Sequence, residues 1–172
     1  MKNIKKALPV IIFIIIILGL YYFLLKNQYD DPNYYEIVNI VDGDTIDINI
    51  NGKTERVRLI GIDTPELVDP RQEVECFAQE ASDRAKEILT GQKVRLESDL
   101  TQGDRDKYNR LLRYVFLENG ASLNQMMIEE GYAHEYTYDL PYKYQEIFQT
   151  AEQGSRTSGL GLWKEGVCDD FK

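Results

Sequence analysis

The sequence predicts an α+β fold that is mainly β: a small closed barrel of five strands with about three helices packed outside it, preceded by one N-terminal transmembrane helix. Three observations lead to this fold class: a long apolar run near the N-terminus, an Asn-Gly turn signal, and short strand patterns interspersed with helical ones. Five strands and a few helices in 172 residues fit a small closed barrel. This length leaves room for one compact domain and a short appendage.

The N-terminus has the pattern of a membrane anchor. An unbroken apolar run of 19 residues extends from Ala7 to Leu25. A helix needs about 20 apolar residues to cross a bilayer, whereas the apolar part of a cleavable signal has about 7 to 15. No small-residue cleavage site follows the run. The sequence therefore favours an uncleaved signal anchor over the two alternatives, cleavage after export and a buried core helix.

This anchor divides the chain into residues 1–29, a basic cytoplasmic tip with the transmembrane helix, and residues 30–172, the folded domain. Lys2, Lys5 and Lys6 precede the span, while Asp30 and Asp31 follow soon after it. The positive-inside rule then places the N-terminus in the cytoplasm and the domain outside. We expect a single-pass protein of the cell membrane, or a secreted protein if the segment is cleaved. No protein partner is implied, and we expect a monomer.

A hairpin forms the first part of the predicted barrel. Residues 45–50 alternate polar and apolar side chains, which is typical of a half-buried strand, and Asn51-Gly52 is the strongest two-residue hairpin signal. With this turn, Asp47 pairs with Arg56 across the two strands, and an opposite-charge pair supports the register. The strand segments are residues 34–41, 45–50, 53–62, 93–97 and 111–117.

The same register restricts the site at the end of the hairpin. It places Arg58 opposite Thr45, beside Asp44, but strict alternation puts Arg58 and Asp44 on opposite faces. If both side chains serve one site, a bulge or a sharp twist must intervene. Gly43 or Gly61 could supply it.

Three helices are expected after the hairpin. Apolar residues keep helical spacing over residues 77–90, and this segment ends at Gly91. Ser122 is the expected N-cap of a helix that extends through Glu130 and stops at Gly131. The last helix is predicted from Tyr142 to about residue 154.

The folded domain is acidic. The chain has 20 basic and 29 acidic residues, and residues 1–29 hold four of the lysines and no acid. Residues 30–172 therefore hold 16 basic and 29 acidic residues, a net charge of −13. Proteins that bind nucleic acid by broad electrostatics are usually basic. To act on a polyanion, this domain needs a local basic pocket and a cation. The single histidine, His134, argues against sites built on several histidines.

Two cysteines, Cys76 and Cys168, lie in the part of the chain that is expected to be exported. Disulfides persist outside the cytoplasm, so a bridge between them is possible, with two unpaired thiols as the alternative. The bridge would enclose 93 residues, counting both ends.

Unusual residues concentrate in three clusters, at residues 42–45, 58–66 and 106–110. Asp44 and Asp63 fall at neighbouring strand ends once the hairpin folds back. Two carboxylates there would form a hard-oxygen site suited to Ca²⁺, with backbone carbonyls and waters completing the shell. The alternative is that both are turn formers, since Asp is common at strand ends.

Other charged and aromatic residues of the chain could contact a phosphate, a base or a sugar. Arg58, within an apolar strand, either binds phosphate as a planar fork or forms a buried salt bridge with Asp44 or Glu66. Arg110 would add a second phosphate contact or be an exposed strand-end charge. Glu66, considered by itself, could be an ordinary surface residue. A base or sugar could pack on aromatic side chains. The candidates are Lys107, Tyr108, Tyr136 and Tyr138.

Together these residues resemble the staphylococcal nuclease (thermonuclease) family. The motifs that carry the resemblance are Val41-Asp-Gly-Asp-Thr45, Arg58-Leu-Ile-Gly-Ile-Asp-Thr-Pro-Glu66, Asp106-Lys-Tyr-Asn-Arg110 and Gly161-Leu-Trp163. All occur in order over about residues 34–163 without an evident insertion. The resemblance implies an OB-type five-stranded barrel with three helices, and calcium-dependent hydrolysis of DNA and RNA that leaves 3′-phosphates.

The resemblance also implies a role for each matched residue. Asp44 and Asp63 would be carboxylate ligands of Ca²⁺, and Thr64 a backbone-carbonyl ligand. Glu66 would orient or deprotonate the attacking water, while Arg58 and Arg110 hold the scissile phosphate and stabilise charge in the transition state. The nucleotide pocket would consist of Lys107, Tyr108, Tyr136 and Tyr138. The membrane span, the two cysteines and the acidic charge depart from the family pattern, which bears on affinity and substrate preference.

Two other classes of function are compatible with the fold. One is a catalytically inactive OB-fold module that binds nucleic acid or protein at the cell surface, and the other is a structural anchor. Degenerate relatives usually lack an arginine or a carboxylate of the site, so the presence of all five catalytic and ligand side chains favours the nuclease. A structural anchor would leave the charge clusters unexplained.

Overall fold

The computed structural model describes residues 15–19, 34–67 and 74–168, and the chain forms two compact units, residues 1–33 and 34–172. In the first unit, residues 15–19 are helical and their side chains are exposed. The rest of the expected span from Ala7 to Leu25 lies outside the described residues. Among the residues that the structure describes, no helix is both long and apolar enough to cross a membrane.

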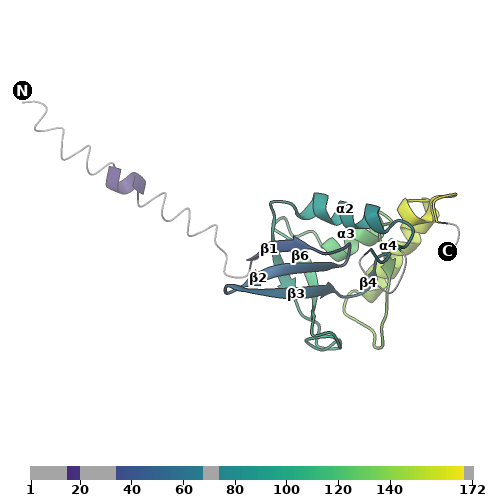
Figure 1. Ribbon diagram of the computed structural model, residues 1–172, viewed down its shortest axis with the longest axis horizontal. Helices are drawn as coiled ribbons and strands as arrows, with labels where there is room; N and C mark the ends of the chain where they lie inside the picture. Colours follow the sequence, from purple (N-terminus) through teal and green to yellow (C-terminus); the bar gives the residue numbers. More distant parts are fainter. Residues whose placement is uncertain (1–14, 20–33, 68–73, 169–172) are drawn as a thin grey trace, which may run out of the picture. The chain divides into compact units, whose positions relative to one another are not determined.

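The second unit contains the predicted closed barrel of five strands (Figure 1). Its strands follow the order β1-β2-β3-β6-β5 around the barrel, and every pairing is antiparallel except the parallel β3–β6 pair. The strands are β1 (Tyr34–Ile40), β2 (Thr45–Ile50), β3 (Lys53–Leu59), β5 (Lys93–Glu97) and β6 (Leu111–Leu117). The prediction of the fold class and of these five strands is confirmed for the barrel.

The β2–β3 hairpin has the predicted register. Asp47 lies opposite Arg56 and Thr45 opposite Arg58. The Arg56 side chain donates to both carboxylate oxygens of Asp47, at 2.8 and 3.1 Å. Asn51 and Gly52 both have positive φ, at 53° and 83°, which the tight hairpin turn requires.

The predicted strand over residues 53–62 is wrong at its end. β3 stops at Leu59, and Gly61, with φ of 77°, turns the chain into a separate short strand, β4 (Ile62–Asp63). β4 pairs with β7 (His134–Glu135), a two-residue strand that the sequence did not predict. A Cβ at Gly61 would lie 2.6 Å from the Tyr142 ring, so the turn also depends on close packing.

Three helices, α2 (Ala78–Leu89), α3 (Leu123–Glu129) and α4 (Gln145–Thr157), pack outside the barrel (Figure 1). Ser122 caps α3 as predicted, since its side chain accepts a hydrogen bond from Gln125 N. α4 begins three residues later than predicted because Tyr142 is buried and its hydroxyl donates to Glu135. A short 3₁₀ helix, η1 (Gly161–Trp163), follows.

Two apolar clusters stabilise the domain. The larger lies inside the barrel and under the helices, where Ile48, Val57, Leu123 and Met127 are fully buried. The smaller comprises buried residues near the C-terminus with partners beside α2: Leu162, Trp163, Cys168, Cys76, Phe77 and Val167. Within it, Cys76 and Cys168 form a disulfide with a Cα–Cα distance of 5.9 Å.

Candidate active site

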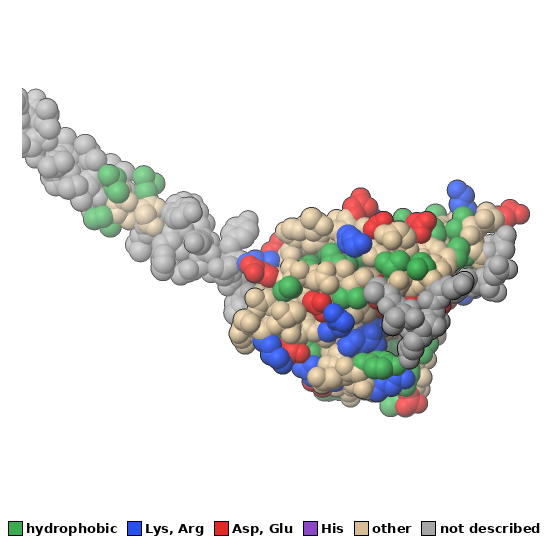
Figure 2. Space-filling model, viewed as in Figure 1, with side chains coloured by type: hydrophobic (Ala, Val, Ile, Leu, Met, Phe, Trp, Pro, Cys, Tyr) green, Lys and Arg blue, Asp and Glu red, His purple; other side chains and the backbone are tan. Residues whose placement is uncertain are grey.

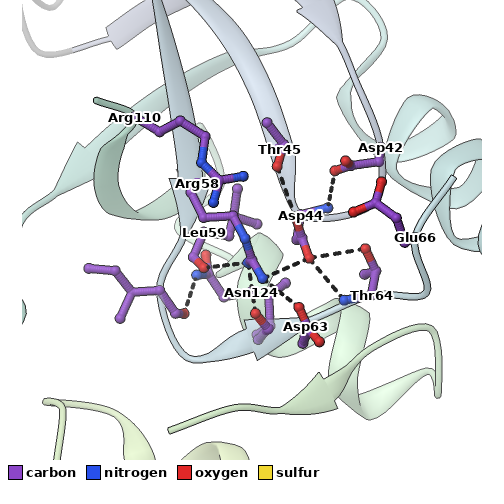
Figure 3. Close-up of polar contacts among 12 residues, drawn as sticks. Asp42, Asp44, Thr45, Arg58, Leu59, Asp63, Thr64, Glu66, Arg110 and Asn124 are labelled. Carbon is purple, nitrogen blue, oxygen red and sulfur yellow. Dashed lines mark hydrogen bonds and ion pairs between the residues drawn. The ribbon is translucent and has the colours of Figure 1, made fainter. Parts of the chain in front are cut away.

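Asp44 is the buried centre of the candidate site (Figure 3). It immediately precedes β2, and its carbonyl oxygen accepts from Leu59 N at 2.9 Å. One carboxylate oxygen accepts from Thr64 N at 2.9 Å and from Thr64 Oγ1 at 3.1 Å, while the other accepts from Thr45 Oγ1 at 2.9 Å. These bonds fix the carboxylate at the junction of the hairpin and the segment after β4.

Arg58 joins the two predicted calcium ligands. Its Nη2 lies 3.1 Å from Asp44 Oδ2 and donates to Asp63 Oδ1 at 2.6 Å. Its Nη1 donates to the carbonyl oxygens of Leu59 and Ile62, at 3.0 and 2.8 Å. The salt bridge to Asp44 that the sequence allowed is therefore present. This salt bridge belongs to the same network as the Arg58–Asp63 contact, and four acceptors orient the Arg58 guanidinium.

The bend that this contact requires is formed by residues 42–44, before β2 begins. Because Asp44 lies outside the strand, strict alternation does not govern its side chain, and Arg58 and Asp44 meet. Gly43 permits the bend, since a Cβ there would come within 2.7 Å of Thr64 Cγ2. Of the two glycines proposed from sequence, Gly43 lies in the bend that allows Arg58 and Asp44 to meet. Gly61 lies in the turn between β3 and β4.

Negative charge accumulates at this end of the hairpin. Burial, followed by the charge of Asp44, raises the pKa of Asp42 to about 7. Burial also raises the pKa of Asp63 to about 6, with Asp44 adding to the rise and Arg58 opposing it. Asp42 accepts a hydrogen bond from Asp44 N at 3.1 Å. The sequence assigned no role to Asp42, although the Asp-Gly-Asp repeat was a signal for it.

The oxygen donors here fit a calcium ion. Among the described residues, no three His, Cys, Asp or Glu side chains come together as a metal cluster. Ca²⁺ takes carboxylate, carbonyl and water oxygens, so two carboxylates and a carbonyl can hold it with water completing the shell. The carboxylates of Asp44 and Asp63 and the carbonyl of Thr64 would provide this set. Burial is the main cause of the raised pKa of Asp63, and a bound cation would favour the ionised form of this carboxylate.

Arg110 is oriented by Asp106, a residue that had no role in the sequence-based prediction. The Arg110 Nε donates to Asp106 Oδ2 at 2.6 Å, and the backbone N–H groups of Arg110 and Tyr108 both donate to Asp106 Oδ1 at 2.9 Å. Asn109 completes the turn with φ of 66°. An Asp side chain often accepts a hydrogen bond from the backbone N–H group two residues later and so closes a turn. Asp at position 106 was therefore the sequence signal for this turn. Within the described chain, the Nη groups of Arg110 donate no hydrogen bond.

A groove of about 480 Å³ unites seven of the predicted site residues: Arg58, Asp63, Lys107, Tyr108, Arg110, Tyr136 and Tyr138. The three tyrosines expose 61%, 43% and 72% of their surface, in chain order, so their rings are available to a ligand. Gln102 also lines the groove, and its amide donates to Leu140 O at 2.9 Å, linking the turn before Lys107 to the loop after Tyr138. Asp44, Thr64 and Glu66 do not line the groove; Asp44 adjoins it through Arg58.

Glu66 lies beside the acidic cluster. Its carboxylate is on the side of Asp42 and Asp44 (Figure 3), and its charge contributes to raising the pKa of Asp42 and of Asp63. Its backbone pairs with Glu75: Glu66 N donates to Glu75 Oε2 at 2.8 Å, and Glu75 N donates to Glu66 O at 3.1 Å. The sequence-based prediction did not include Glu75, whose contact with Glu66 depends on the tertiary fold.

The surface agrees with the charge prediction. Figure 2 shows acidic and basic side chains interspersed over one face of the domain, rather than a broad basic surface. Positive charge at the site is therefore local and comes from the arginines and the lysine that line the groove. A five-stranded OB-type barrel with these carboxylates, arginines and tyrosines at one end defines an enzyme of the nuclease class.

Comparison with known proteins supports this class. The family model described as staphylococcal nuclease homologue matches residues 56–165. A thermonuclease of Staphylococcus hyicus is 34% identical over 170 residues, which cover 95% of this chain and 99% of that protein. A thermonuclease of Staphylococcus intermedius is 39% identical over 130 residues, 76% of each chain. An SPbeta prophage-derived endonuclease of Bacillus subtilis is 41% identical over 133 residues, 76% of this chain and 44% of that protein.

The chain belongs to the staphylococcal nuclease homologue family. It is a hydrolase, a nuclease of the thermonuclease type. The resemblance found in the sequence motifs is confirmed at the level of family, barrel and enzyme class.

Proposed function

We propose that this chain is a calcium-dependent phosphodiesterase that hydrolyses DNA, RNA or both outside the cytoplasm and releases 3′-phosphate products. The observation that carries the proposal is the position of Arg58. Its guanidinium bridges the carboxylates of Asp44 and Asp63 at the wall of a groove that Arg110 also lines. The names of the relatives, thermonuclease and endonuclease, support a nucleic acid substrate.

The two arginines form the phosphate seat. Arg58 is largely shielded from solvent, with 14% of its side chain exposed, and is fixed by four acceptors, so its charge is preorganised. Among the described residues, Arg110 is held by the hydrogen bond from its Nε to Asp106, and its two Nη groups can make a bidentate contact with phosphate oxygens. Fixed positive charge beside a phosphorus atom stabilises the additional negative charge of the transition state. Together these arginines bind the scissile phosphate and lower the barrier to attack.

Other residues accept the proton of the attacking water and bind the nucleoside. Glu66 lies beside the acidic cluster and accepts the proton of the attacking water. When bound by Asp44, Asp63 and the Thr64 carbonyl, Ca²⁺ would supply positive charge to the phosphate and bind water. The exposed rings of Tyr136 and Tyr138, whose centroids lie 6.3 Å apart, stack on a base or sugar. Lys107 and Tyr108 line the same groove and contact the nucleotide there.

The location outside the cytoplasm rests on the N-terminal sequence. The 19-residue apolar run with lysines before it supports a single-pass anchor, with residues 1–29 as tip and span and residues 30–172 outside, or secretion if the segment is cleaved. Protease added to intact cells should digest the domain of the anchored form. Full protection of a membrane-bound domain would contradict this orientation.

The activity is tested by digesting end-labelled DNA and RNA with the full chain in a non-ionic detergent, in Ca²⁺ or in excess chelator. We expect cleavage that needs Ca²⁺ and products whose 3′ phosphate a phosphatase removes. Undiminished cleavage in chelator would contradict calcium dependence. Binding of both nucleic acids without cleavage would instead identify the inactive OB-fold module.

A further inference from the structure

Glu66 is held by a two-point contact with Glu75, nine positions further along the chain. The Glu66 N–H donates to the Glu75 carboxylate at 2.8 Å, and the Glu75 N–H donates to the Glu66 carbonyl at 3.1 Å. Both bonds act on the backbone that carries the Glu66 side chain. The position of Glu75 therefore sets the position of the residue that we propose as the general base.

Glu75 is itself held from the other side. Its carbonyl oxygen accepts from Ala78 N at 3.1 Å, in the turn that leads into α2. The next residue, Cys76, forms the disulfide with Cys168. Phe77 then adopts φ of 71°, which is unusual for an aromatic residue, and its ring stacks on Tyr132 at 5.4 Å. Glu75 thus lies between its contact with Glu66 and a cross-linked turn.

The other end of the disulfide is fixed to the body of the domain. Cys168 is 3% exposed and packs with Leu162 and Trp163 of η1. Trp163 packs edge-on against His134 at 4.8 Å, and Arg156 of α4 lies 3.7 Å from its ring centroid. Because His134 belongs to β7, which pairs with Asp63 of β4, this cluster reaches back to the site from a second direction.

We propose that Glu75 is a positioning residue for Glu66, and that the Cys76–Cys168 disulfide maintains turnover by holding Glu75 in place. The inference rests on the proposed function, because it assigns its effect to the general base. Its chain of contacts runs from the η1 cluster through Cys168 and Cys76 to Glu75 and then to Glu66. The disulfide is then more than a stabilising cross-link: opening it displaces the base relative to the phosphate seat.

The first experiment changes Glu75 in the full chain and measures kcat and KM per folded molecule. Displacement of a catalytic group by about 1 Å can cost about a hundredfold in rate, so we expect Glu75→Ala to lower kcat about ten- to a hundredfold with little change in KM. Glu75→Gln keeps an acceptor oxygen for Glu66 N and should restore most of the turnover. Glu80→Ala, which removes an exposed carboxylate in the first turn of α2, is the charge-matched control and should retain wild-type kcat.

A double mutant separates positioning from general destabilisation. If Glu75 acts through Glu66, Glu75→Ala should slow the wild type but add little to the defect of Glu66→Gln, because residues that act as a unit are not additive. An equal slowing in both backgrounds would show that Glu75 acts independently of the base. That result would overturn the proposal.

The disulfide is tested at a temperature at which every variant is folded. Cys76→Ser with Cys168→Ser should lower both Tm and kcat per folded molecule, whereas Leu89→Ala, a buried helix residue far along α2, should lower Tm alone. Treatment with a dithiol should reproduce the loss of kcat: it transfers two electrons and two protons to the bridge, giving two thiols, and is itself oxidised to a disulfide.

Three results would overturn the inference: wild-type kcat in Glu75→Ala, wild-type kcat per folded molecule in the double serine variant, or additivity with Glu66→Gln. Failure of the proposed function has a different signature. In that case the wild type itself is inactive with Ca²⁺, or Glu66→Gln cleaves at the full rate, and both results would remove the basis of this inference as well.

Discussion

Arg58 Nη2 lies 3.1 Å from Asp44 Oδ2, so the planar donor of the proposed phosphate seat and the central carboxylate of the proposed calcium site are in direct contact. The contact neutralises part of the charge of a buried carboxylate. It also couples the two halves of the site, since a change at Asp44 alters the guanidinium that meets the substrate.

We expect Asp44→Asn to weaken calcium binding. Asn replaces an oxygen by an amide donor that faces Thr64 and Arg58, both of which are donors, and it removes one ligand charge. Asp47→Asn is the matched control on the same hairpin, because Asp47 pairs with Arg56 and Asn39 rather than with the candidate site. Calorimetric titration with Ca²⁺ should show weaker binding for the first variant alone. Equal affinity in both variants would exclude Asp44 as a ligand.

We expect Asp106→Asn to lower kcat by releasing Arg110. The carboxylate of Asp106 receives both the Nε of Arg110 and the backbone of the turn, and a neutral amide weakens these charge-assisted bonds. Asp104→Asn serves as the control, since Asp104 pairs with Arg113 instead. Steady-state kinetics on a short oligonucleotide would show the difference. Similar kinetics in the two variants would remove Asp106 from the site.

The tyrosines should affect substrate affinity more than turnover. Stacking of one base on an aromatic ring is worth about 1 to 3 kcal/mol, so Tyr136→Ala or Tyr138→Ala should raise KM by the corresponding factor, with kcat less affected. Phe at either position keeps the ring and should keep KM close to the wild-type value. If KM is unchanged in the alanine variants, the groove does not hold the nucleoside in this way.

The hairpin was predicted better than the two short strands and the start of the last helix. The β2–β3 register followed from Asn51-Gly52 and from local alternation, which short-range interactions determine. The two-residue strands β4 and β7 were missed because two residues carry no periodicity and their pairing depends on distant contacts. The later start of α4 has the same origin, since the tertiary contact of Tyr142 with Glu135 outweighs helix propensity.

The residues proposed to act on the substrate were recognisable as motifs, whereas their supporting residues were not. Arg58, Asp63 and Arg110 stand out because these charged side chains lie within, at the end of, or just before a strand. Glu75 and Asp106 support them through bonds to backbone and guanidinium groups, and many surface acids look alike in sequence. Only the folded arrangement distinguishes them.

The stability of the fold should decrease in acid, partly because Asp99 becomes protonated. Burial raises the pKa of this carboxyl group, but hydrogen bonds from Lys143 N, Tyr114 OH, and Thr101 N and Oγ1 outweigh burial and lower the pKa to about 2. A folded-state pKa below the ordinary 3.8 means that the ionised group stabilises the fold at neutral pH, by about 2 kcal/mol. This contribution is present above about pH 4 and is lost as the pH falls towards 2.

Urea unfolding of wild type and Asp99→Asn at several pH values tests this assignment. The difference in the free energy of unfolding between the two proteins should be largest near pH 7 and should shrink below pH 4. A difference that stays constant from pH 7 to pH 2.5 would show that the carboxylate charge of Asp99 does not contribute.

The central claim is that Arg58 stabilises charge that develops at the phosphate during attack. Lysine keeps the charge but loses the planar fork, and losing one donor of this kind costs about 2.7 to 4 kcal/mol, roughly a hundred- to thousandfold in rate. Arg56→Lys, on the same strand but paired with Asp47, is the control.

The most direct measurement is the single-turnover rate of cleavage with saturating Ca²⁺, with the melting temperature of the same samples. The predicted result is a folded Arg58→Lys protein that binds Ca²⁺ and cleaves about a hundred- to a thousandfold more slowly, beside an Arg56→Lys control at the wild-type rate. A depressed melting temperature with the wild-type rate per folded Arg58→Lys molecule would contradict the claim and leave Arg58 as a structural salt bridge.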